Sequence, residues 1–141
     1  MANYEMIDNE IKKDIHLCFN RSTGAGDLLF KKTLENSENV SLKEIISINN
    51  DEVFQSFVEF CGPNGLGMPP FSDTLQAKCT YKIFFMFFAE SLSEEDRNNP
   101  YIRIIDIKNK YGDFRLPPVD FNDPQIIAKI NMWLAEIPNN A

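Results

Sequence analysis

The chain has 141 residues, of which 43% are hydrophobic and 25% charged, as expected for a globular protein and not for a disordered one. Its formal net charge at pH 7 is −7. This charge disfavours binding to nucleic acid or to an anionic membrane, because both depend on clustered Lys and Arg. We therefore predict one globular domain over residues 1–141, with no nucleic-acid or membrane partner.

The cysteines and the apolar runs indicate a protein of the cytoplasm. Cys18, Cys61 and Cys79 are odd in number and lie far apart, so we expect buried free thiols instead of disulfides or a metal site. Residues 1–15 carry charges throughout and lack the apolar core of a signal peptide. The longest apolar run, residues 83–89, is far shorter than the roughly 20 residues of a membrane helix.

Short helices are predicted before residue 50. Apolar residues recur every three or four positions over 3–20, which is typical of an amphipathic helix. A second, shorter helix is expected over 27–34. Ser41 and Glu44 match a capping box, in which each side chain bonds the free backbone N–H of the other residue. This box is expected to open a short helix that ends near residue 48.

The middle of the chain holds its most apolar segment. Asn50 is placed to cap a helix over 51–61 that Gly62 and Pro63 end. After a loop rich in Gly and Pro, Ser72 is expected to cap a long element over 73–92. The four phenylalanines of residues 80–89 must be buried in it. The upstream cap and the length favour a helix, although a strand also fits the aromatic content.

The last third of the chain changes character. Residues 93–100 are predicted to form a charged turn, and the isoleucine-rich residues that follow favour a small β-hairpin over 101–116. A helix that starts at Pro100 is the alternative. Asp123 as N-cap and Pro124 at the first helical position predict a helix over 124–137. The sequence thus predicts a mainly α fold, a compact bundle of five or six helices, with an α+β arrangement if the hairpin forms.

No residue pattern points to catalysis, a cofactor or a metal. His16 is the only histidine, and Cys18 on the same predicted helix would point about 200° away from it. The acids of 94–96 form a short, solvated stretch in which we expect no metal. The glycine-containing loops lack the Lys-Ser/Thr pair of a phosphate-binding loop. We predict no cofactor and no enzymatic activity. A carboxylate-dependent enzyme is an alternative, because acids distant in sequence can meet in the fold.

The remaining candidates are surfaces that could bind another protein. Acidic residues crowd the first predicted helix and the middle of the chain, and a Met and a Phe lie beside prolines in the 62–71 loop. The presumed hairpin carries Tyr101 and a second tyrosine, and an exposed hairpin edge can add to a partner's sheet. The partner-binding residues we predict are Glu5, Asp8, Asp14, Glu35, Glu38, Asp51, Glu52, Met68, Phe71 and Tyr111.

Size, acidity and the lack of a chemical motif together favour a small, non-enzymatic inhibitor. Such a protein would neutralise a basic effector or toxin by direct binding, as immunity proteins do. An oligomeric scaffold or secretion-type chaperone is the competing interpretation. The sequence leaves open whether the protein is a monomer or a dimer.

Overall fold

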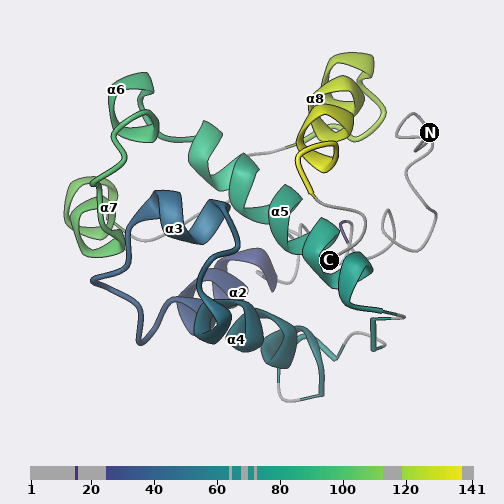
Figure 1. Ribbon diagram of the computed structural model, residues 1–141, viewed down its shortest axis with the longest axis horizontal. Helices are drawn as coiled ribbons and strands as arrows, with labels where there is room; N and C mark the ends of the chain where they lie inside the picture. The colour runs from purple at the N-terminus through teal and green to yellow at the C-terminus, as the bar shows by residue number, and fades with distance from the viewer. Residues whose placement is uncertain are drawn as a thin grey trace.

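A central helix, α5 (Thr74–Glu90), crosses the middle of the molecule, and the other helices pack around it (Figure 1). The computed structural model describes residues 15, 25–63, 65–67, 70–71, 73–112 and 119–137. Its further helices are α2 (Ala25–Thr33), α3 (Leu42–Ile46), α4 (Asp51–Cys61), α6 (Glu94–Arg97), α7 (Ile104–Tyr111) and α8 (Pro124–Leu134). The prediction of a mainly α fold is confirmed. The helix predicted over 3–20 lies outside the described residues, apart from Ile15.

Helix α5 begins one residue later than predicted. Its N-cap is Asp73, whose carboxylate accepts a hydrogen bond from the Gln76 backbone N–H at 2.7 Å; the predicted cap, Ser72, lies outside the described residues. The aromatic block of residues 80–89 is helical, which confirms the helix and removes the strand alternative. Every residue from 79 to 89 except Met86 is buried, so this helix has no solvent-facing stripe over most of its length.

The two faces of α5 belong to two hydrophobic clusters. Tyr81, Phe84, Phe85 and Phe88 pack with residues of α2, α3, α4 and α7. Cys79, Ile83 and Phe87, on the opposite face of α5, pack against buried residues of α8. The rings of Phe30 and Phe84 are 4.4 Å apart between centroids on the first side. On the second side, Phe87 and Trp133 meet edge to face at 4.8 Å. Helix α5 therefore joins the two halves of the core.

Helices α3 and α4 begin where the sequence predicts, whereas α2 begins at Ala25, two residues before its predicted start. Ser41 Oγ accepts the Glu44 backbone N–H at 3.2 Å and starts α3. Asn50 Oδ1 accepts the Val53 backbone N–H at 3.1 Å and starts α4. Helix α2 packs against α4, and both lie on the same side of α5 (Figure 1). Leu66 and Phe71 of the loop after α4 also pack against this cluster.

The β-hairpin predicted over 101–116 is wrong for residues 104–111, which form helix α7. A carboxylate of Asp106 accepts the Arg103 backbone N–H at 3.0 Å and so fixes the helix start. Ile104 and Ile107, three positions apart, both reach the core. Among the described residues, the only strand-like pairing is one isolated antiparallel bridge between Ser41 and Arg103. Residues 113–116 of the predicted hairpin lie outside the described residues.

The charged turn and the last helix complete the described chain. Ser93 caps the single turn of α6, which the sequence had suggested only as a turn. Asp123 caps α8 and Pro124 opens it, as predicted. The helix ends at Leu134, and Ile137 stays buried in the turns that follow. Within the described ranges, no helix combines the length and the apolar character that a membrane span requires.

Candidate functional site

One set of carboxylates holds the helices together through ion pairs. Glu90 at the end of α5 binds Lys129 of α8 at 2.7 Å and lies 3.9 Å from Arg97 of α6. Glu38, one of the predicted partner-binding residues, lies 3.5 Å from Lys108 of α7. The other pairs among the described residues are Lys110–Asp96, Lys82–Glu136 and Arg103–Asp106, the last of which lies between α7 and its own N-cap. These acids are neutralised within the molecule and add little to its outer field.

Asp96 lies at the centre of a polar cluster that joins α6 to α7. Its carboxylate binds Lys110 Nζ at 2.8 Å and accepts a short hydrogen bond from the Tyr111 hydroxyl. The hydrogen bond from Lys110, followed by that from Tyr111, holds the pKa of Asp96 below its usual range. Ser93 completes the cluster, because its backbone N–H donates to the same Tyr111 hydroxyl at 3.0 Å.

A second set of carboxylates has neither an ion pair nor a hydrogen-bond partner among the described residues. All of its members are exposed at the surface. Asp51 and Glu52 lie in the first turn of α4, and Glu59 lies near its last turn. This free set consists of Glu35, Asp51, Glu52, Glu59, Glu94 and Glu95.

Helix α4 presents its acids on a rigid support. Val53, Phe54 and Phe57 are buried, and the Phe57 ring lies 5.2 Å from that of Tyr81 in the central helix. Positions 52, 55 and 59 are exposed and recur at helical spacing, so Glu52 and Glu59 share the outer face of α4. A rigid helix carrying unpaired acids is suited to electrostatic recognition, since little conformational entropy is lost on binding.

The structure divides the predicted partner-binding residues into groups. Glu35, Asp51 and Glu52 are exposed and free of ion pairs among the described residues. Phe71 is half-buried and packs against the core. Tyr111 is 39% exposed, but its hydroxyl is bound within the Asp96 cluster. The residues that lie outside the described ranges are Glu5, Asp8, Asp14 and Met68.

Three members of the free set, Glu59, Glu94 and Glu95, are absent from the predicted partner-binding residues. Glu94 and Glu95 were interpreted only as part of a solvated turn. The signal that could have located them is Ser93 followed three positions later by Asp96, the spacing of a helix N-terminal cap. Once α6 is recognised, its first turn must carry both glutamates on the surface.

The described residues contain no arrangement suited to metal or thiol chemistry. No group of three or more His, Cys, Asp or Glu among them could hold a metal ion. Cys61 and Cys79 are free and buried, as predicted, whereas Cys18 and His16 lie outside the described ranges. Burial, with Asp73 nearby, raises the pKa of the Cys79 thiol to about 11. This thiol is therefore protonated and unreactive at neutral pH.

Comparison with protein-family models, curated proteins and solved structures gave no match to this chain.

Proposed function

We propose that this chain is a non-enzymatic, cytoplasmic protein that neutralises a basic effector or toxin by binding it directly. The observation that carries the proposal is the division of the acids into two sets. The acids at the contacts between α5, α6, α7 and α8 are paired, whereas Asp51, Glu52 and Glu59 of α4 and Glu94 and Glu95 of α6 are exposed and unpaired within the described part of the chain.

The position of Glu59 supports a role beyond helix stability. Asp51 and Glu52 lie in the first turn of α4, where negative charge stabilises a helix through its dipole. Glu59 lies near the opposite end, and the last turn of α4 holds no basic residue. A carboxylate there costs the helix about 0.3–1 kcal/mol. Contact with a cationic partner would explain why an acid occupies this position.

Unpaired surface acids suit the proposed partner for physical reasons. Their field attracts a basic protein over a Debye length, about 8 Å at physiological ionic strength. It accelerates association and fixes the register of binding. The paired acids add little to this effect, since each already faces a cation of the same chain.

The proposal is tested by purifying the tagged protein from its native host at low and at high salt. We expect a basic partner at stoichiometric yield at low salt, released as the salt is raised. Recovery of no stoichiometric partner, or of acidic partners only, contradicts the proposal. Light scattering on the same sample identifies the competing scaffold or chaperone, which would form a stable homo-oligomer without that partner.

A further inference from the structure

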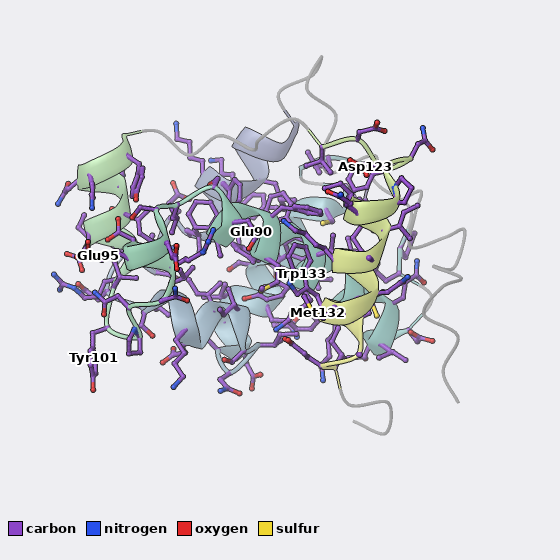
Figure 2. The ribbon with its side chains drawn as sticks, turned by 90° about the horizontal axis from the view of Figure 1, so that it is seen from above. Glu90, Glu95, Tyr101, Asp123, Met132 and Trp133 are labelled. Carbon is purple, nitrogen blue, oxygen red and sulfur yellow. The ribbon has the colours of Figure 1, made fainter. Side chains whose placement is uncertain are left out.

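Tyr101 is the most exposed of the large hydrophobic side chains in the described ranges. Its exposed fraction is 84%, compared with 59% for Met132, 39% for Tyr111 and 37% for Leu75. Figure 2 shows Tyr101 pointing away from the body of the molecule, at the same end as Glu95. A tyrosine ring that is this exposed contributes little hydrophobic stabilisation to the fold, because most of its apolar surface stays in water.

The turn that carries Tyr101 is fixed by hydrogen bonds on both sides. The Tyr101 backbone N–H donates to Asn99 Oδ1 at 2.9 Å, and the Ile102 N–H donates to the Asn99 carbonyl at 3.3 Å. Ile102 is buried, and its carbonyl accepts the Leu42 N–H at 2.8 Å. The aromatic ring is consequently presented on an ordered backbone, which lowers the entropic cost of a contact.

The cations of the α6–α7 region are paired with acids other than Glu94 and Glu95. Each cation of the α6–α7 region already has a carboxylate partner: Arg97 has Glu90, Arg103 has Asp106, Lys108 has Glu38 and Lys110 has Asp96. Glu94 and Glu95 have no ion-pair or hydrogen-bond partner in the described part of the chain. Glu95 also lies near enough to Lys110 to contribute to the raised pKa of that lysine, behind the larger effect of Asp96.

We propose that Tyr101, with Glu94 and Glu95, forms a contact site for a cationic segment of a partner protein. An Arg or Lys of the partner stacks on the Tyr101 ring while neighbouring cations face the two glutamates. Tyrosine is among the residues that dominate binding energy at interfaces. The site rests on the proposed function and adds to it, because it places a second contact with the basic partner at the α6–α7 corner.

The test uses the intact protein and a nine-residue arginine peptide as the cationic probe. Amide chemical shifts are followed by NMR during titration at low salt, for wild type and four variants. The variants are Tyr101→Ala, Tyr101→Phe, the pair Glu94→Gln/Glu95→Gln, and Met132→Ala as the control for an exposed side chain on another helix. A melting curve for each variant confirms that it is folded.

We expect the largest shifts over residues 94–102. Tyr101→Ala should weaken binding by about fivefold, as expected for the loss of an exposed cation–π contact. Tyr101→Phe should retain most of the affinity because the ring remains, the glutamate pair should lose affinity, and Met132→Ala should not. Binding confined to α4 and unaffected by Tyr101→Ala overturns the site but leaves the proposed function standing. Absence of any binding also overturns the site, and the proposed function is then decided by its own purification experiment.

Discussion

Tyr81 donates its hydroxyl hydrogen to the carbonyl oxygen of Ile45 at 2.8 Å, which links the central helix to the end of α3. Helix α3 is short, and its last carbonyls have no partner within the helix. The next residue of α5, Lys82, binds the next carbonyl, that of Ile46, at 2.9 Å. Burial raises the pKa of Tyr81, so its hydroxyl remains a neutral donor across the physiological range.

Tyr81→Phe should destabilise the protein by about 0.5–1.5 kcal/mol, because it removes one buried hydrogen bond while the ring is retained and the Ile45 carbonyl keeps its bond from the Ile48 backbone N–H at 3.1 Å. Urea unfolding measures this difference. Tyr101→Phe is the matched control, since removing the hydroxyl of an exposed tyrosine should leave the free energy of unfolding unchanged. Equal midpoints for wild type and Tyr81→Phe would show that the hydrogen bond contributes nothing.

Lys82→Met should also cost about 1–3 kcal/mol, since it removes the donor to the Ile46 carbonyl but keeps a long apolar side chain. Glu136→Gln removes only the salt bridge at 3.2 Å, in which the Glu136 side chain is 54% exposed. That loss should be roughly 0–1 kcal/mol. The two variants are compared by urea unfolding, and an equally large effect of Glu136→Gln would mean that the ion pair is the main contribution of Lys82.

Phe84→Asp should prevent folding, because its fully buried ring lies between those of Phe30 and Phe57. The milder Phe84→Ala should cost about 3–5 kcal/mol through lost burial and a cavity. Circular dichroism and urea unfolding provide the measurements, and Met132→Asp at the exposed surface of α8 is the control. A soluble, cooperatively folded Phe84→Asp variant would contradict the assignment of this residue to the core.

Asp96 should make the α6–α7 junction sensitive to acid. Its folded-state pKa lies below the ordinary value of about 3.9, so its charged form stabilises the folded state above that pH. The stabilisation is lost as the pH falls from about 4 through the folded-state pKa. The difference in melting temperature between wild type and Asp96→Asn should therefore shrink between neutral pH and about pH 2. A difference independent of pH would show that the Asp96 charge is not linked to folding.

The elements with a local signal could be predicted from the sequence. Asn50 and Asp123 cap their helices through hydrogen bonds to residues two or three positions away. Both caps can therefore be recognised from a few consecutive residues of the sequence. The burial of the phenylalanines in residues 80–89 could be predicted from the apolar, aromatic character of that segment alone. Helix α7 was harder to predict, because isoleucines suit both strands and helices and the Asp106 side chain decides between them locally.

The candidate surface was only partly predictable for a different reason. Asp51 and Glu38 look alike in the sequence, but only the fold brings Lys108 beside Glu38 and leaves Asp51 unpaired among the described residues. Phe71 likewise belongs to a loop that appears exposed in sequence yet packs on the core. Long-range pairing determines which charges remain available, and a single sequence does not encode it in any local pattern.

The most direct test of the proposed function is the dissociation constant of the basic partner purified from the host. It is measured by calorimetry for wild type, for Asp51→Asn/Glu52→Gln, for Glu59→Gln and for Ala128→Lys/Ala135→Lys. The two double variants raise the net charge equally, but the second lies on exposed positions of α8 and the residue that follows it. It therefore controls for charge alone.

We predict that Asp51→Asn/Glu52→Gln weakens binding about tenfold, a change of about 1.4 kcal/mol, while the α8 control stays within about twofold. Glu59→Gln should weaken binding without loss of thermal stability, since the helix dipole disfavours a carboxylate there. Equal dissociation constants for wild type and both α4 variants, or an equal loss in the α8 control, would contradict binding through the free acids of α4.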